Sequence, residues 1–207
     1  MSAELIPLFP LSVVLLPAMP LPLHIFEERY KELMGEVIPA QAEFGIVLAK
    51  EGGIVNIGCT ALVDRVLQRY PDGRLDLLAV GQRRFRITSL DEEKPYLRAE
   101  VEFFDDEDVR EVSFDLKEKA AAAYRTLLKI ENPEESDDAR LESARMSFQV
   151  AELILDLDKR QTVLSLRSEV ERLEYLVRIV PEYANQQQRV ALAKRVGPLN
   201  GHAKAAP

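Results

Sequence analysis

The chain has 207 residues, of which 47% are hydrophobic and 30% are charged, a balance typical of a folded globular protein rather than a disordered one. Its formal net charge of −8 argues against a general affinity for nucleic acid or for anionic membranes. The single cysteine, Cys59, excludes an internal disulfide and a cysteine-cluster metal site. The first residues lack the basic start and the apolar helix of a secretory signal, so we expect a cytoplasmic protein.

The segment 5–23 carries no charge and contains five prolines. Its length approaches the ~20 apolar residues of a membrane-spanning helix, but each proline removes an amide hydrogen and disfavours the helical conformation in the residue before it. A membrane span is therefore not expected. The segment instead predicts short strands over 5–9 and 12–16, followed by an amphipathic helix over about 26–38 that stops at Pro39.

Apolar segments separated by turn signals continue to about residue 104 and predict more strands. These strands are expected over 43–50, 54–69, 74–80, 83–90 and 96–104. The glycines of Gly52-Gly53 and Pro71-Asp72-Gly73 favour tight turns between them, because glycine adopts positive φ without strain. The apolar periodicity predicts a core that contains Phe9, Val14, Phe26, Phe44, Ile46, Val63, Phe85 and Ile87.

The remainder of the chain has helical periodicity. Helices are expected near 110–131, 138–156 and 159–180, with a fourth over 181–196. Ser168 and Glu171 have the spacing of a capping box, and Pro181 is expected to kink or restart a helix. The fold class is therefore α+β, with a β-rich domain over 1–104, an α-helical bundle over 105–196 and a flexible tail over 197–207.

The order of several motifs resembles one protein family. The opening reads PLFPLSVVLLPAMPLPLHIFEERY over 7–30 and is followed in order by FGIVL at 44–48, IGCTA at 57–61, GQRRFRI at 81–87 and PYLRAEV at 95–101. Together these motifs resemble the N-terminal substrate-recognition domain of the Lon ATP-dependent proteases. The resemblance implies a mostly β, PUA-like pseudo-barrel followed by an α-helical bundle. It also implies a non-catalytic module that recognises unfolded or tagged polypeptides.

The ATPase and peptidase motifs of a complete Lon protease are missing from this sequence. The nearest approach to the phosphate-binding G-x-x-x-x-G-K-[ST] pattern lies near Gly197 and Gly201, but its spacing is wrong. The family's peptidase serine follows Pro-x-Asp-Gly-Pro-Ser, whereas Pro71-Asp72-Gly73 continues to Arg74. The resemblance thus implies a stand-alone recognition domain that is not an enzyme. Such an adaptor or chaperone-like module would have a protease or chaperone as a further partner.

Neither histidine lies at ligand or catalytic spacing from other candidate residues. His24 lies between the proline-rich segment and the first helix, and His202 lies in the tail. Acidic pairs such as Asp105-Asp106 are typical of solvated turns. We therefore assign no catalytic, cofactor-binding or metal-binding residue and expect no cofactor. A hydrolase with an unrecognised site remains an alternative, and the sequence assigns no oligomeric state.

The apolar turn around residues 15–21 is the candidate polypeptide-binding site, represented by Leu16, Pro17, Met19 and Leu21. Methionine and leucine adapt to varied partners, and prolines hold the segment extended, so that it has little conformational entropy to lose on binding. The competing interpretation is that these residues cap the core of the β domain.

Arginines on neighbouring strands form a candidate basic face, represented by Arg65, Arg69, Arg84 and Arg86. Alternation along a strand would place Arg84 and Arg86 together in solvent and turn Phe85 inward. This pattern favours an alternative function, an RNA-binding PUA-like module. The competing interpretation is a solvated face neutralised by acidic residues on the same strands, and on that interpretation no nucleic-acid partner is expected.

Overall fold

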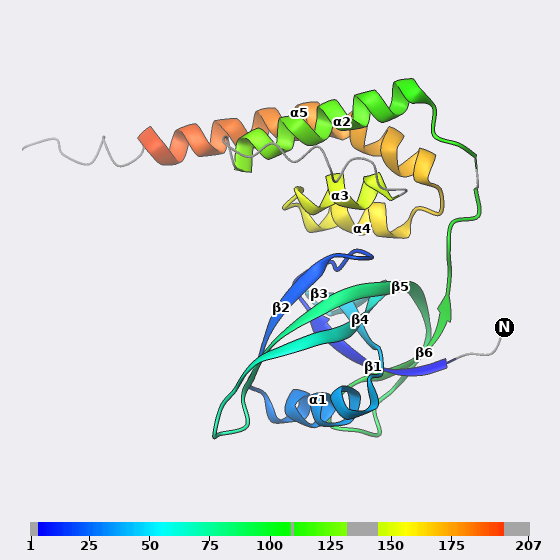
Figure 1. Cartoon of the computed structure of the whole chain (residues 1–207), viewed down its shortest axis with the longest axis vertical. Helices are drawn as coiled ribbons and strands as arrows, with labels where there is room; N and C mark the ends of the chain where they lie inside the picture. The colour runs from blue at the N-terminus through cyan, green and yellow to red at the C-terminus, as the bar shows by residue number, and fades with distance from the viewer. Residues whose placement is uncertain (1–3, 109, 132–144, 197–207) are drawn as a thin grey trace, which may run out of the picture. The chain divides into compact units, whose positions relative to one another are not determined.

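The computed structural model describes residues 4–108, 110–131 and 145–196 (Figure 1). The chain divides into two compact units. The first, here called the barrel unit, comprises residues 1–107 and 155–167. The second, here called the helical unit, comprises residues 108–154 and 168–207. Residues 155–167 thus belong with the β-rich part of the chain, which differs from the helical domain expected over 105–196.

The barrel unit is built on one mixed sheet. Its described strands are β1 (Glu4–Leu11), β2 (Pro20–Ile25), β3 (Phe44–Lys50), β4 (Gly53–Arg69), β5 (Leu75–Asp91) and β6 (Arg98–Phe103). They lie in the order β2-β5-β4-β3-β1-β6, and a further pairing of β5 with β6 closes the barrel. The long strand β5 makes this closure possible, because its first half pairs with β2 and its second half pairs with β6.

The barrel core forms where β1, β3, β5 and β6 face one another. Its central cluster consists of Ile6, Leu8, Val47, Phe85, Ala99 and Val101. Gly58 must lack a side chain, since a Cβ there would lie 2.5 Å from the carbonyl oxygen of Ile46 and 2.5 Å from the Phe85 ring. The close approach of these strands therefore depends on glycine at this position.

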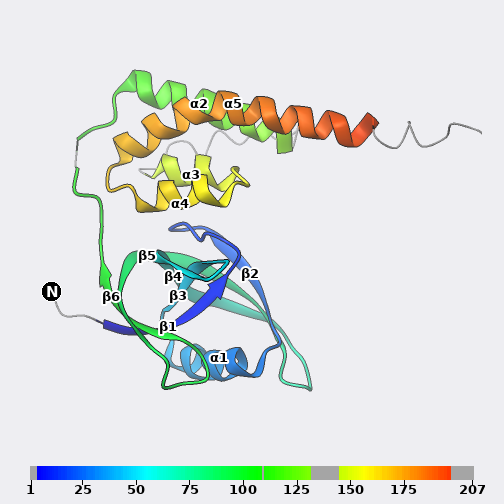
Figure 2. The same ribbon diagram turned by 180° about the vertical axis from the view of Figure 1, so that it is seen from behind.

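Two helices complete the barrel unit at opposite ends of the barrel (Figure 2). Helix α1 (Glu28–Ala40) buries Tyr30, Leu33, Met34 and Val37, which follow helical spacing. Helix α4 (Leu157–Ser165) begins at Asp156, whose side chain accepts a hydrogen bond from the amide of Lys159. Lys50 and Gln161 then tie α4 to the barrel, through Asp158 and the carbonyl oxygen of Ile57 respectively.

The helical unit contains α2 (Phe114–Glu131), α3 (Met146–Glu152) and α5 (Glu169–Val196). In both views α2 and α5 lie side by side. The hydroxyl of Ser168 accepts a hydrogen bond from the amide of Glu171, as the capping pattern predicts. Buried side chains from the three helices form the core of this unit, among them Tyr124, Phe148, Leu176 and Val180.

Several expected elements of the barrel unit are wrong in extent. Residues 12–16 form no strand. The second strand is β2, which was not expected because its sequence contains prolines. The expected strands over 74–80 and 83–90 are one continuous strand, β5. Pro39 lies within the last turn of α1 rather than ending it, and the chain leaves the helix at Gln41 in the left-handed conformation.

The helices also differ from expectation. The expected helix over 159–180 is two helices, because Leu166 is extended and Ser168 caps a new start. Pro181 lies inside α5 and does not restart it. Only α3 represents the helix expected over 138–156, of which residues 138–144 lie outside the described residues. The expected tail over 197–207 also lies outside them.

The predicted core is confirmed at five of its positions: Phe9, Val14, Phe44, Ile46 and Phe85 are buried. Val63 and Ile87 are only partly buried. Phe26 was wrongly placed in the core, because its side chain is 58% exposed. It lies between the end of β2 and the start of α1, so it takes no part in the buried face of that helix.

Candidate functional site

An apolar groove of about 360 Å³ opens in the barrel unit. It lies between β2, the end of β1 with the residues that follow it, and the first turn of α1. Its walls are formed by Phe9, Leu11, Val13, Leu21, Pro22, Leu23, His24, Ile25, Phe26, Glu27 and Tyr30. A concave, mostly apolar surface with a few polar groups at its margin is the usual form of a binding site.

Two aromatic rings in contact, tilted by 33° to each other, form a buried part of the groove wall. The ring centroids of Phe9 and Tyr30 lie 4.0 Å apart, and both residues are buried. Burial also raises the pKa of the Tyr30 hydroxyl, because the ionised form would lose its hydration. Phe9 is held by β1 and Tyr30 by the first turn of α1, so two rigid elements fix this surface before any ligand arrives.

Polar contacts hold His24 at the margin of the groove. Its Nδ1 lies 2.5 Å from Asp76, and the Tyr70 hydroxyl donates to the same carboxylate over 2.7 Å. Both contacts lower the pKa of the Asp76 carboxyl, and the hydrogen bond with His24 contributes most. The His24 ring stacks on Phe26 with 5.8 Å between centroids. The exposed phenyl ring is therefore supported by a side chain that is itself anchored to β5.

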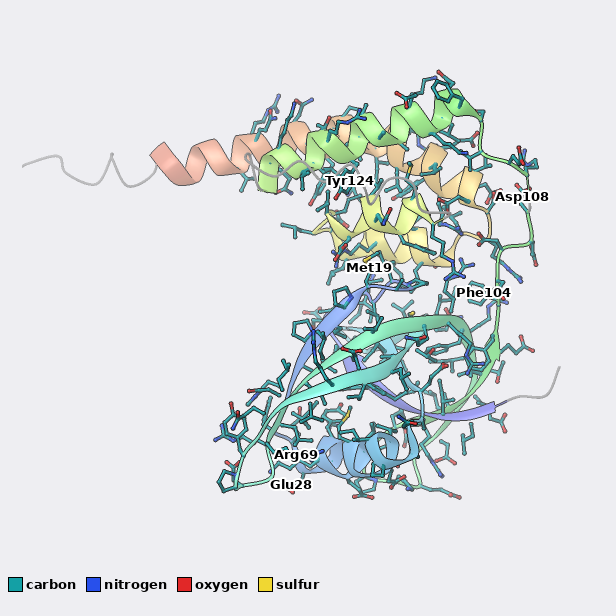
Figure 3. All side chains as sticks on the ribbon, in the orientation of Figure 1. Met19, Glu28, Arg69, Phe104, Asp108 and Tyr124 are labelled. Atoms are coloured by element: carbon teal, nitrogen blue, oxygen red, sulfur yellow. The ribbon has the colours of Figure 1, made fainter. Side chains whose placement is uncertain are left out.

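The structure separates the four residues of the predicted binding turn. Leu16 and Pro17 are buried, in agreement with the interpretation that they cap the core. Met19 and Leu21 are partly exposed, and of the four only Leu21 lines the groove. Figure 3 shows Met19 and Glu28, the first residue of α1, at opposite ends of the barrel unit. The predicted turn and the groove therefore share only Leu21 among the four predicted residues.

Sequence reasoning missed the groove residues Phe9, Phe26 and Tyr30 as binding candidates. Phe9 and Phe26 were assigned to the core, and Tyr30 to the buried face of a helix. No signal in the sequence marked Phe26, because its spacing from Tyr30 and Leu33 matches the apolar face of the expected helix. No pattern along the chain shows that the end of β1, β2 and the start of α1 together line a groove.

The buried turn before β2 depends on Gly81. The amide of Gly81 donates to the carbonyl oxygen of Met19, and its own carbonyl accepts from Ala18. A Cβ on Gly81 would lie 2.2 Å from the carbonyl oxygen of Leu16, which is backbone and cannot rotate away. Glycine at position 81 therefore allows the backbone of Leu16 to approach β5 closely.

We expect Gly81→Ala to lower the free energy of unfolding by about 1–3 kcal/mol, the usual cost of overpacking. Gly35→Ala is the matched control, because a Cβ at this exposed position in α1 meets nothing within 4 Å. That control is expected to be neutral or stabilising by about 0.5–1 kcal/mol. Urea unfolding of both variants measures the difference, and equal stabilities would contradict the role assigned to Gly81.

The candidate basic face is not one surface. Arg84 is buried, contrary to expectation, because α4 covers that side of β5. Its guanidinium donates to the carbonyl oxygen of Leu166 and to Asp106, each over 2.6 Å. Arg65, Arg69 and Arg86 are exposed, but the register of β4 and β5 sets Arg86 opposite Ile57 and Arg69 opposite Leu75, at distant points of the hairpin.

Among the residues that the structure describes, no group of three or more His, Cys, Asp or Glu side chains is placed to hold a metal ion. None of the described helices is both long and apolar enough to cross a membrane. His24 contacts Asp76, Phe26 and Tyr70 and is part of the groove margin.

A closed mixed barrel with a flanking helix and an apolar groove, joined to a helical unit, defines an α+β binding domain. The family model described as "ATP-dependent protease La (LON) substrate-binding domain" matches residues 5–182. The chain therefore belongs to this family, and the resemblance seen in its motifs is confirmed.

Among curated proteins, the chain is 26% identical to a Lon protease of Roseiflexus castenholzii over 237 aligned positions. The alignment covers 97% of this chain and 29% of that protein. The chain is 30% identical to a Lon protease of Parabacteroides distasonis over 112 residues, which cover 50% of this chain and 14% of that protein. The chain thus spans less than a third of the length of these relatives.

Two solved structures have similar folds. The Lon N-terminal domain protein from Xanthomonas campestris matches with a TM-score of 0.69 and 27% identity, covering 84% of this chain and 97% of that one. The N-terminal domain of a Lon protease from the Mycobacterium avium complex matches with a TM-score of 0.60 and 18% identity, covering 88% of this chain and 98% of that one. The second likeness concerns the fold alone. The α+β fold class expected from the sequence is confirmed by both.

Proposed function

We propose that this domain recognises non-native polypeptides and that the apolar groove beside β2 binds their exposed apolar side chains. The observation that carries the proposal is the exposed Phe26 at the margin of a groove whose floor is already packed by Phe9 and Tyr30. Membership of a substrate-binding-domain family supports the same conclusion.

The groove suits a ligand that varies in sequence. Apolar burial is not directional and is roughly proportional to the area removed from water, so side chains of different shape can contribute similar free energy. The pre-formed walls limit the ordering cost of binding to the ligand itself. Unfolded segments expose such side chains and folded proteins hide them, which gives a basis for selecting non-native polypeptides.

In this proposal the domain binds and does not catalyse. It supplies recognition to a protease or chaperone, which would act on the bound segment, and it does so in the cytoplasm. Tagged polypeptides are included among the ligands where the tag is apolar.

We expect Phe26→Ser to weaken binding of a permanently unfolded polypeptide about tenfold. A bound ligand would cover part of the Phe26 ring, and losing that contact costs about 1–2 kcal/mol. The thermal midpoint should stay nearly unchanged, since the Phe26 side chain is already 58% exposed. A fluorescein-labelled, reduced and carboxymethylated protein serves as the probe, and fluorescence anisotropy measures its affinity.

Leu90→Ser is the matched control, because Leu90 is 50% exposed on β5 but does not line the groove. Met19→Ser in the same assay tests the turn predicted from the sequence. Wild-type affinity for Leu90→Ser and reduced affinity for Phe26→Ser are expected. A folded Phe26→Ser variant with unaltered affinity would reject the groove as the binding site.

A further inference from the structure

Strand β2 is at one end of the strand order, and the groove runs along it. Within the described residues β2 pairs with β5 alone, in a continuous register from Pro20 opposite Val80 to Ile25 opposite Leu75. The other side of β2 faces the groove, whose lining includes every residue from Leu21 to Ile25. An unpaired strand beside an apolar groove would ordinarily accept an extended peptide as an added strand.

Two prolines, Pro20 and Pro22, remove hydrogen-bond donors from β2. A proline has no amide hydrogen, so in a paired strand it occupies a position whose backbone faces away from the partner strand. Pro20 and Pro22 are two residues apart and thus direct their backbones to the same side. Because β2 keeps its register with β5 through both positions, that side is the free one. The free edge therefore has no donor at two successive outward positions.

Strand addition would be unfavourable on such an edge. A peptide that paired there would leave carbonyl oxygens opposite Pro20 and Pro22 without donors, and desolvating an unpaired polar group costs about 1–3 kcal/mol. Insertion of the peptide's side chains needs no such donors, because they would contact Leu21, His24 and the exposed ring of Phe26 in the groove. The remaining way to occupy the groove is to insert side chains while the peptide backbone stays hydrated.

We propose that the groove binds side chains without strand pairing, and that its ligands therefore include apolar segments that lack backbone amide hydrogens, such as proline-rich ones. This inference rests on the proposed function and adds to it the class of segment that is bound. The same prolines protect the groove from edge-to-edge association, because an unfolded chain cannot extend the sheet through β2.

The inference is tested with one apolar peptide in four forms. The parent contains leucine and phenylalanine in a soluble background, and two further forms carry N-methyl groups on its odd or its even amides. The fourth replaces the apolar residues by serine. Fluorescence anisotropy with the full chain is expected to give affinities within about threefold for the parent and for both N-methylated forms, and a loss of more than tenfold for the serine form. Strand pairing uses alternate amides, so it predicts that one of the two N-methylated forms loses its affinity. A tenfold loss in either N-methylated form would overturn the inference.

A variant of the protein provides the reciprocal test. Pro20→Ala restores an amide hydrogen at an exposed position of the free edge, outside the residues that line the groove. The side-chain mode predicts that this variant binds the parent peptide within threefold of the wild type, whereas strand pairing predicts a gain of tenfold or more. Failure of the parent peptide to bind, or equal binding by Phe26→Ser, would remove the proposed function and this inference with it. Binding of the parent that N-methylation abolishes would remove the inference alone.

Discussion

Phe85→Ala is expected to lower the free energy of unfolding of the barrel unit by about 3–5 kcal/mol. The Phe85 side chain is fully buried and lies in the central cluster with Leu8, Val47 and Val101. Gly45 and Gly58 pack directly against its ring, since a Cβ at either would lie within 2.7 Å of it. Neighbours that are already glycines have no side chain with which to refill the space, so the substitution leaves a cavity.

Urea unfolding followed by circular dichroism measures this change, with Leu90→Ala as the control on the same strand. Leu90 is half exposed, and its truncation should alter stability by less than about 1 kcal/mol. Because the chain forms two compact units, hydrogen exchange at barrel amides should accompany the unfolding curve. A loss of less than about 1 kcal/mol for Phe85→Ala would show that the ring does not fill the core.

Arg172→Ala is expected to destabilise the helical unit by a comparable amount, about 3–5 kcal/mol. The Arg172 side chain is 1% exposed, and it donates to Ser147 over 2.8 Å and to Glu169 over 2.7 Å. Glu169 also accepts hydrogen bonds from the amide and the hydroxyl of Ser147. The network thereby joins the start of α3 to the first turn of α5. Its loss would leave a mostly buried carboxylate without its counter-charge.

The double variant Glu169→Gln with Arg172→Met distinguishes charge from packing. It removes both charges and keeps an unbranched apolar side chain over the Phe148 ring, which Arg172 now covers at 4.6 Å. We expect the double variant to lose less stability than Arg172→Ala, because no isolated buried charge remains. Hydrogen exchange in α3 and α5 measures both variants. Equal losses would mean that packing alone accounts for the effect.

Local signals predicted much of the fold correctly. The glycines near residues 52 and 73 adopt positive φ in turns between strands, as their type predicts. Ser168 starts α5 at the position given by its spacing from Glu171. Strands β3, β4 and β6 follow runs of apolar and β-branched residues. In each case the deciding interaction lies within a few residues of chain.

The errors arose where the deciding interaction lies far away in sequence. Pro20 and Pro22 argued against a strand, yet β2 forms because β5 supplies its partner and its free edge needs no donor. Arg84 was expected in solvent, but it is buried and donates to the carbonyl oxygens of Leu164 in α4 and Leu166 directly after it, some eighty residues later. Phe26 was expected in the core, but α1 begins only at Glu28, so Phe26 precedes the helix and does not share its buried face.

The sequence by itself determined the family, the α+β class and the apolar, proline-rich character of the segment beside the site. These properties follow from residue type and local spacing, which need no knowledge of distant contacts. Only the tertiary structure decided that Leu16 and Pro17 are buried while Phe26 is exposed, and that a groove opens along β2. Burial and concavity depend on which segments meet in space. In this chain the pairing of β5 decides which segments meet. Its pairing with β6 closes the barrel, and its pairing with β2 leaves the other edge of β2 free.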